Sequence, residues 1–335
     1  MTEHTTGRLG LPVGITGTGV HEPDLVVTND DLVAGGLDTS DAWIRDRTGI
    51  RERRFLRPGR TTSDMCVAAA EEALREAGTG AARLDAIIIS TFTQDQPLPS
   101  TALMVKERLG AHRALPLDLN QAACAGGVYG LWVAAHLLQN QGLENVLVIG
   151  AECLSRVTDP DDRGTRVFFG DAAGAAVLSR TGPGRGLLAW HAGSKLSHSV
   201  EIPAGGSRLP SSPDTAAGGG HFLKMDGRAV WKEATEHLPA SVRAVLDAAG
   251  HAVGEVDHFV FHQANLNIIK EAMRELGQPF SKATLSVDRL GNTGAATIFL
   301  GLHELLAGGR ARAGDLTVVS AIGAGFLWGS LCLRH

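Results

Sequence analysis

The sequence predicts an α/β protein made of two similar halves, because it contains an internal repeat and alternating strand and helix patterns. Residues 74–90 align without a gap with residues 246–262, and an apolar strand ends both segments. Residues 123–126 align with residues 291–294 at nearly the same separation. A repeat of about 170 residues is too long for a solenoid unit, so it indicates a duplicated α/β domain.

The first half shows the order of elements within this domain. An amphipathic pattern predicts a helix over residues 63–77, and an apolar strand follows over residues 86–91. A further helix ends near Gly110. Then come a strand, a turn of small residues, a helix to about Gln141 and another strand over residues 145–150. Strands that alternate with helices predict mostly parallel sheets covered on both faces.

Two turn-rich stretches interrupt the pattern. Residues 179–186 separate the repeats, so we divide the chain into an N-terminal half, residues 1–180, and a C-terminal half, residues 181–335. Residues 204–220 contain ten Gly, Ser or Pro residues in 17, which predicts a long loop. Such a loop is either a mobile lid over the active site or plain connecting chain.

Composition limits the class of protein. The chain has 335 residues, 44% of them hydrophobic, and a net charge of -5, which is enough for a large core and argues against general nucleic-acid binding. Its four cysteines have neither metal-ligand nor disulfide spacing. The first residues do not resemble a signal peptide, and no segment has the apolar length of a membrane span. We expect a cytoplasmic protein with reduced thiols, no bound metal, no nucleic-acid partner and no membrane association.

Cys124 is the candidate nucleophile. It follows an apolar alternating strand and lies where a helix begins, between residues with very small side chains. The positive partial charge at a helix N-terminus lowers the pKa of a thiol, and small neighbours let a substrate reach the sulfur. A lone cysteine is more often a small buried core residue, so this interpretation needs support from elsewhere in the chain.

His262 and Asn292 supply that support. His262 ends a buried strand of the second half, and Asn292 lies in the turn that the repeat makes equivalent to the turn of Cys124. A pseudo-two-fold axis between the halves would bring the three side chains together. Alone, a histidine is usually a core or surface residue and an asparagine before Thr-Gly is usually a turn former. The combination indicates a shared site.

These segments resemble the β-ketoacyl-acyl-carrier-protein synthase III family of thiolase-like condensing enzymes, over about residues 10 to 335. The resemblance implies the five-layer α-β-α-β-α thiolase-like fold and a homodimer. The motifs that carry it are Ala-Ala-Cys124-Ala-Gly, His262-Gln-Ala-Asn265, Gly291-Asn292-Thr, Phe169-Gly-Asp171 and the run from Asp38 to Arg51.

The resemblance implies a two-stage reaction. Cys124 would accept an acyl group from an acyl-CoA, and His262 and Asn292 would then stabilise the enolate formed when a malonyl thioester loses CO₂. The backbone N–H groups of Cys124 and Ala324 would form the oxyanion hole. The family usually has glycine where Ala324 stands, which a backbone group tolerates if φ stays negative. No cofactor is implied beyond the CoA thioesters that serve as substrates.

The resemblance also implies a CoA-binding entrance. Trp43 would stack on the adenine with Arg163 on its other face, Thr39 would contact the adenine, and Arg47 would contact a phosphate. The simpler interpretation of the arginines at 45–54 is a solvated basic strip. Asn265 would order a water or make a supporting hydrogen bond.

The chain departs from the family pattern at several positions. Asn267 replaces an arginine linked to docking of the acyl carrier protein, and the cations Arg228, Lys232 and Lys224 could compensate. Gly127 stands where an aromatic residue is common, and Trp231 where a phenylalanine lines the acyl pocket. Leu98 matches the residue that closes this pocket from the partner subunit, although it could equally be an ordinary interface residue. Together these changes predict a reshaped acyl pocket and a pathway-specific starter.

Several other functions stay open or rank lower. An acyltransferase of the same fold would pass the acyl group from Cys124 to another nucleophile or carrier without decarboxylation. Hydroxymethylglutaryl-CoA synthesis needs a carboxylate near the cysteine, and the matching turns contain no glutamate. An inactive partner subunit would lose the nucleophile that this chain keeps. Clustered metal ligands and a Gly-x-Gly-x-x-Gly nucleotide motif are both absent from the sequence.

Overall fold

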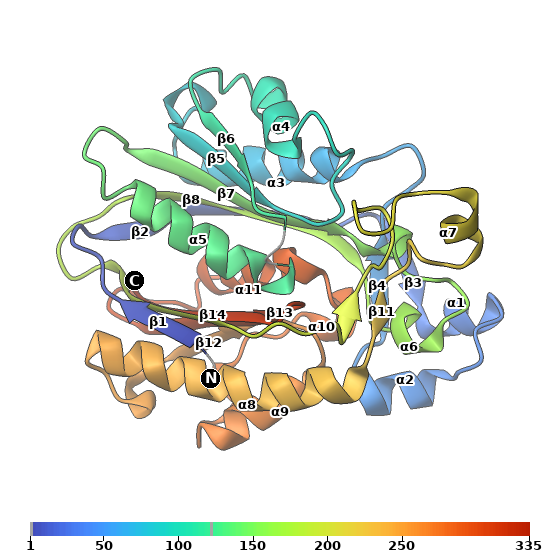
Figure 1. Ribbon diagram of the computed structural model, residues 1–335. Coiled ribbons are helices and arrows are strands. Elements are labelled where there is room, and N and C mark those ends of the chain that lie inside the picture. Colours follow the sequence, from blue (N-terminus) through green and yellow to red (C-terminus); the bar gives the residue numbers. More distant parts are fainter. Residues whose placement is uncertain (1–2, 121–122) are drawn as a thin grey trace.

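The computed structural model describes residues 3–120 and 123–335, and it is built on two five-stranded sheets (Figure 1). The first sheet has the order β2 (Val13–His21), β8 (Asp171–Arg180), β7 (Asn145–Cys153), β5 (Ala86–Ser90) and β6 (Leu115–Asp118). The second has the order β1 (Glu3–Gly7), β9 (Gly186–Ser194), β14 (Leu327–Arg334), β13 (Leu316–Gly323) and β12 (His258–Phe261).

Helices and sheets alternate in five layers, as the resemblance implied (Figure 1). The outer face of the first sheet is covered by α3 (Thr62–Glu76) and α4 (Thr101–Leu109). Between the sheets lie α5 (Gly126–Leu137) and α11 (Thr297–Leu306), whose apolar residues join both sheets in one core. The outer face of the second sheet is covered by α8 (Gly227–Ala249) and α9 (Leu266–Glu275).

Both sheets are mixed, so the prediction of mostly parallel sheets is wrong. β5 pairs in parallel with β6 and β7, whereas β8 runs antiparallel to β7 and β2. In the second sheet β12 and β13 are parallel, and the other three pairings are antiparallel. The reason is that β13 returns directly into β14 through a tight turn instead of crossing over through a helix.

The repeat in the sequence corresponds to a repeat in the fold. β5 and β12 occupy equivalent positions, each paired in parallel with a strand of its own sheet. The first sheet uses strands from residues 13–180, and the second uses strands from residues 186–334. β1 is the exception, because this N-terminal strand pairs antiparallel with β9 in the second sheet.

Shorter elements complete the fold near the site. They are β3 (Leu25–Thr28), α1 (Asn29–Ala34), α2 (Asp41–Thr48), β4 (Glu52–Phe55), α6 (Arg163–Arg166), β10 (Val200–Glu201), α7 (Pro213–Ala217), β11 (Lys224–Met225) and α10 (Val287–Leu290). Single 3₁₀ turns lie at Ala81–Arg83, Ala123–Ala125, Leu154–Arg156, Val253–Glu255, Phe280–Lys282 and Gly294–Ala296.

Most predicted elements are confirmed with small shifts at their ends. The helix expected over residues 63–77 is α3, with Thr61 and Asp64 forming a capping box. The helix after Cys124 ends at Leu137, short of the predicted Gln141. The predicted loop at residues 204–220 contains the short helix α7, and β10 pairs with β11 to close its base.

Candidate active site

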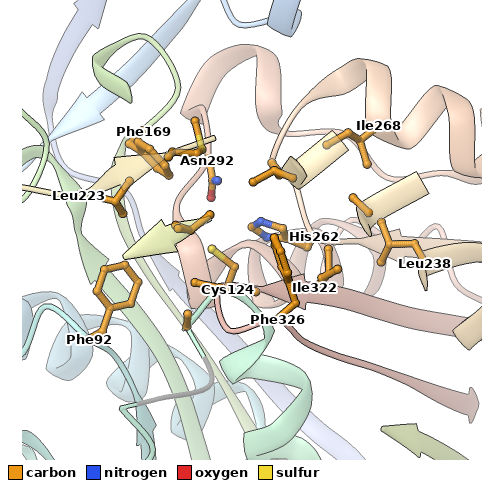
Figure 2. Close-up of a pocket in the computed structure, with 18 residues that line it drawn as sticks. Phe92, Cys124, Phe169, Leu223, Leu238, His262, Ile268, Asn292, Ile322 and Phe326 are labelled. Carbon is orange, nitrogen blue, oxygen red and sulfur yellow. The ribbon is translucent and has the colours of Figure 1, made fainter. Parts of the chain in front are cut away.

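Cys124, His262 and Asn292 line one cavity, together with Ala324 (Figure 2). Figure 2 shows the sulfur, the imidazole ring and the carboxamide directed into the same space. Cys124 comes from the first half, and the other three residues come from the second. The cavity wall is otherwise apolar, with Phe92, Leu223, Leu238, Ile268 and Phe326 among its side chains.

Cys124 lies in the 3₁₀ turn that joins β6 to α5. Ala123, directly before it, has φ 44 and is the single non-glycine residue at positive φ among the described residues. Such a conformation is strained for a residue with a Cβ and is found preferentially at functional sites. Gly126 approaches β5 so closely that a Cβ there would lie 2.8 Å from the Cβ of Ser90. The small residues therefore place the sulfur at the start of the central helix.

The pKa of the Cys124 thiol is raised to about 12, so the prediction of a thiol acidified by the helix N-terminus is wrong. Burial is the main cause, and the negative charge of Glu152 adds to it. Hydrogen bonding from Asn292 acts in the opposite direction but is the weaker effect. The resting residue is a neutral thiol, which must lose its proton to a nearby group when it attacks a substrate.

The Asn292 backbone is fixed between residues of the first half. Its N–H donates to the carbonyl of Phe168 at 2.8 Å, and its own carbonyl accepts from Gly170 at 3.0 Å. Gly291 makes this approach possible, because its φ is 64 and a Cβ would lie 2.6 Å from the Phe168 oxygen. The Asn292 Oδ1 accepts from the Gly294 N–H at 2.9 Å. The Nδ2 group is thereby left as the donor for the cavity.

His262 follows β12 and is 3% exposed. Its backbone N–H donates to the carbonyl of Ser320 at 2.8 Å, which continues the β12–β13 ladder. Its Nδ1 lies 2.7 Å from the hydroxyl of Thr297, so Nε2 is the ring nitrogen left for the cavity. Burial lowers the pKa of His262 to about 3, so the imidazole is neutral at ordinary pH.

Ala324 lies in the turn between β13 and β14 and lines the cavity. The turn is held by β9 and the residues after it, because Lys195 N–H donates to Phe326 O at 2.8 Å and Ser197 N–H donates to Gly325 O at 2.6 Å. Both bonds direct carbonyls away from the site. Ala324 does not adopt positive φ, so alanine in place of glycine costs no backbone strain here.

Three of the predicted CoA-binding residues, Trp43, Arg47 and Arg163, lie together. The Arg163 guanidinium lies 5.0 Å from the ring centroid of Trp43, and that of Arg47 lies 5.9 Å from it. Arg163 also donates to the carbonyl of Asp38 at 2.9 Å. Thr39 is half-buried next to this pair. Trp43 and Arg163 therefore make a direct cation–π contact.

An adjoining cavity shares Phe169 and Asn292 with the first and is lined by Trp231 and Asn265. Trp231 is 42% exposed and does not line the inner cavity. The prediction that it lines the acyl pocket is therefore corrected, because Trp231 lines the adjoining cavity instead. Leu98 is 83% exposed and does not reach the cavity of its own chain.

The other departures from the family pattern have structural explanations. Asn267 donates to the carbonyl of Arg47 at 3.0 Å, and Asn265 donates to the same carbonyl at 3.1 Å. Both asparagines therefore fix the C-terminal end of α2. Gly127 does not open the acyl pocket, because a Cβ there would lie 2.6 Å from Ile298 in the helix–helix contact. Arg228 and Lys232 are exposed on α8 beside Trp231.

Two residues at the site gave no signal in the sequence. Glu152, at the end of β7, is fully buried and accepts hydrogen bonds from Thr93 and Phe92. It belongs to a strand of mostly apolar residues and lies outside the turns that the repeat makes equivalent. Thr297 begins an apolar helix, where a threonine commonly has no functional role. Only the spatial arrangement connects these residues with Cys124 and His262.

Among residues 3–120 and 123–335, no group of three or more His, Cys, Asp or Glu side chains could hold a metal ion. Within the same ranges, no helix combines the length and apolar character needed to cross a bilayer.

Comparison with known proteins gives a consistent result. The family model described as 3-Oxoacyl-[acyl-carrier-protein (ACP)] synthase III matches residues 117–196, and its C-terminal model matches residues 246–335. The beta-ketoacyl-[acyl-carrier-protein] synthase III of Symbiobacterium thermophilum is 46% identical over 325 residues, which cover 96% of this chain and 98% of that protein.

Solved structures are similar over nearly the whole chain. The 3-oxoacyl-[acyl-carrier-protein] synthase III of Aquifex aeolicus has a TM-score of 0.88 and 38% identity, covering 96% of this chain and 100% of that one. The priming beta-ketosynthase from the R1128 polyketide biosynthetic pathway has a TM-score of 0.88 and 32% identity, covering 98% of this chain and 97% of that one.

Proposed function

Because the chain belongs to the 3-oxoacyl-[acyl-carrier-protein] synthase III family, we propose that it condenses an acyl-CoA starter with a malonyl thioester through an acyl-Cys124 intermediate. This is a decarboxylative Claisen condensation that initiates fatty-acid or polyketide synthesis. The observation that carries the proposal is the convergence of a thiol, a neutral imidazole and a carboxamide on one apolar cavity.

The first half-reaction transfers the acyl group. The Cys124 sulfur attacks the thioester carbonyl, and the thiol proton passes through His262 to the sulfur of the departing CoA. The backbone N–H groups of Cys124 and Ala324 stabilise the negative charge on the tetrahedral oxygen. A raised thiol pKa makes the proton acceptor necessary.

The second half-reaction forms the new carbon–carbon bond. The malonyl thioester loses CO₂, and Nδ2–H of Asn292 with a ring N–H of His262 stabilises the enolate oxygen. Asn292 does not titrate, so it donates at any working pH. The enolate carbon attacks the acyl group on Cys124, and the 3-oxoacyl thioester leaves. The reaction uses CoA thioesters as substrates and needs no further cofactor.

The entrance binds the CoA nucleotide. We assign adenine stacking to Trp43 and Arg163, an adenine contact to Thr39 and a phosphate contact to Arg47. The cation–π contact between Trp43 and Arg163 supports this, since it places an aromatic ring and a guanidinium, both of which stack on bases, side by side. An acyl carrier protein would dock through Arg228 and Lys232, exposed cations on the helix that carries Trp231.

The active protein is proposed to be a homodimer. β6 is an edge strand of the first sheet, and its residues Leu115 and Leu117 are 57% and 39% exposed. An exposed apolar edge strand invites pairing with a second copy. Leu98, exposed in a single chain, would then be available to close the acyl pocket of the partner.

The proposal is tested by following both half-reactions separately. The protein is incubated with a panel of acyl-CoAs and weighed intact, and CO₂ release from a malonyl thioester is then measured. We expect an acyl adduct that Cys124→Ala abolishes, and CO₂ release that depends on Asn292. An adduct that passes to another nucleophile without CO₂ release would indicate the acyltransferase instead. The apolar wall predicts hydrocarbon starters, and clear preference for acetyl over every longer chain would contradict a pathway-specific starter.

A further inference from the structure

The hydroxyl of Thr297 connects His262 to the turn that carries Asn292. Thr297 Oγ1 lies 2.7 Å from Nδ1 of His262 and 2.9 Å from the carbonyl oxygen of Gly294. Thr297 and His262 are 1% and 3% exposed, so both contacts are buried. The structure thus places one buried hydroxyl between a ring nitrogen and a carbonyl.

A hydroxyl has a single hydrogen, which it can give to only one of these two neighbours at a time. When it donates to Gly294 O, it must accept from a hydrogen on Nδ1, and Nε2 then carries a lone pair. When it donates to Nδ1, the ring hydrogen lies on Nε2. A backbone carbonyl or a backbone N–H in place of the hydroxyl would allow only one of these arrangements.

The two arrangements are similar in free energy because the carbonyl oxygen of Gly294 has a second hydrogen-bond donor. The backbone N–H of Thr297 also donates to this oxygen at the end of the 3₁₀ turn. Rotation of the hydroxyl toward His262 therefore does not leave a buried carbonyl without a partner, which would otherwise be expensive. Burial keeps the imidazole of His262 neutral, so the two states differ in tautomer and not in charge.

The two half-reactions need opposite states of Nε2. Acylation needs a lone pair there, to accept the hydrogen of the protonated Cys124 thiol. Decarboxylation needs a hydrogen there, to donate to the enolate oxygen together with Asn292. A single fixed tautomer of His262 would serve one step and oppose the other.

We propose that Thr297 is a positioning residue whose hydroxyl accepts from Nδ1–H during acylation of Cys124 and donates to Nδ1 during decarboxylation. This inference rests on the proposed function. In acylation the thiol hydrogen passes to Nε2 and then to CoA sulfur, as the bond to CoA breaks and the bond to Cys124 forms. In condensation the C–CO₂ bond breaks, the enolate carbon attacks, and the Cys124 thiolate leaves and takes a proton from water. Between the two steps Nε2 takes a proton from water in the cavity, and Nδ1 returns one to water when its contact with Thr297 opens, so the ring neither gains nor loses a hydrogen.

The test compares two substitutions at one position. Thr297→Val removes the hydroxyl at nearly constant shape, and Thr297→Ser keeps it. We expect Thr297→Val to slow both acylation and CO₂ release by about tenfold or more, since positioned proton transfer contributes about 10²–10⁴-fold. Thr297→Ser should restore most of both rates. Wild-type rates for Thr297→Val in either step, or a serine variant as slow as the valine variant, would overturn the proposal.

Thr284→Val is the matched control. Thr284 is fully buried against the same helix, where a Cβ on Gly301 would lie 2.8 Å from its hydroxyl oxygen. Within the described residues this hydroxyl has no hydrogen-bond partner, so its removal should leave both steps unchanged. If wild-type protein itself formed no adduct or released no CO₂, the proposed function would fail, which is a different result from failure of the Thr297 variants.

A spectroscopic test does not depend on the Thr297 variants. Protein labelled with ¹⁵N-histidine shows which ring nitrogen of His262 carries hydrogen, with the signal identified by its loss in His262→Ala. We expect hydrogen on Nδ1 in the free protein and on Nε2 once Cys124 is acylated. Hydrogen on the same nitrogen in both forms would show that the hydroxyl does not change roles.

Discussion

The backbone N–H of Gly294 donates to Oδ1 of Asn292 at 2.9 Å, and this bond determines which end of the carboxamide faces the cavity. With Oδ1 engaged, Nδ2 is free to donate to an oxygen in the site. The turn therefore presents Asn292 as a hydrogen-bond donor before any substrate binds, which is the orientation that an enolate needs.

Replacement of Asn292 should separate the two half-reactions. Asn292→Asp keeps the shape and the bond from Gly294 but offers an acceptor and a negative charge to the enolate. We expect CO₂ release to fall by about 10²–10³-fold, the usual cost of losing one oxyanion donor, while acylation of Cys124 stays nearly intact. Rapid-quench mass spectrometry measures the first step and CO₂ release the second. Loss of acylation as complete as in Cys124→Ala would show that the assigned role is wrong.

Trp43→Ala should weaken binding of CoA substrates. A base–aromatic stack contributes about 1–3 kcal/mol, so KM for acyl-CoA should rise roughly 5- to 150-fold. Acyl-pantetheine provides the control, because it carries the same thioester without an adenine. Its KM should be unchanged by the substitution. An equal rise for both substrates would place Trp43 outside the nucleotide site.

Glu152 should make stability depend on pH. Burial raises its pKa from 4.5 to about 8, so the folded protein holds a proton that the unfolded chain releases. The contribution of this proton to the free energy of unfolding is complete below about pH 4.5. It is lost as pH rises through about 8, at up to about 1.4 kcal/mol per pH unit. Buried histidines titrate with the opposite sign and below pH 6.5.

Glu152→Gln should therefore flatten the free energy of unfolding between about pH 6.5 and pH 8, relative to wild type. Urea unfolding at several pH values in this window measures the difference. The neutral side chain also removes the charge that raises the Cys124 pKa, so thiol alkylation should begin at lower pH. Identical pH profiles for both proteins would mean that Glu152 stays ionised in the fold.

Charge reversal on α8 should affect only the carrier-borne substrate. Arg228→Glu together with Lys232→Glu places acidic groups where an acidic carrier protein would approach. We expect KM for malonyl-carrier protein to rise, most strongly at low salt, because exposed charges are screened as ionic strength increases. KM for malonyl-CoA should not change. Equal effects on both substrates would argue against docking at this surface.

The sequence predicted the duplicated fold and the meeting of Cys124, His262 and Asn292 because both depend on local patterns. Apolar strands, small-residue turns and the repeat show that each of these residues lies at the end of an element. Because the two halves are related, their equivalent ends lie close together. The antiparallel strands were missed because periodicity identifies a strand without giving its direction.

Burial explains the remaining errors. The sequence favours a thiol acidified by a helix N-terminus, but desolvation within the cavity raises the pKa of Cys124 instead. Gly127 belongs to the changes that predict a reshaped pocket, and only the packing shows that Ile298 lies against it. Glu152 and Thr297 act through contacts with distant segments, which no local pattern records.

The pairing of β1 with β9 also bears on how the chain is made on the ribosome. Glu3–Gly7 is synthesised well before Gly186–Ser194, its only strand partner among the described residues. Until that partner emerges, the first strand presents unsatisfied backbone groups, the kind of edge that favours aggregation of a nascent polypeptide. The second sheet is thus completed by a segment that is synthesised before the rest of the first half.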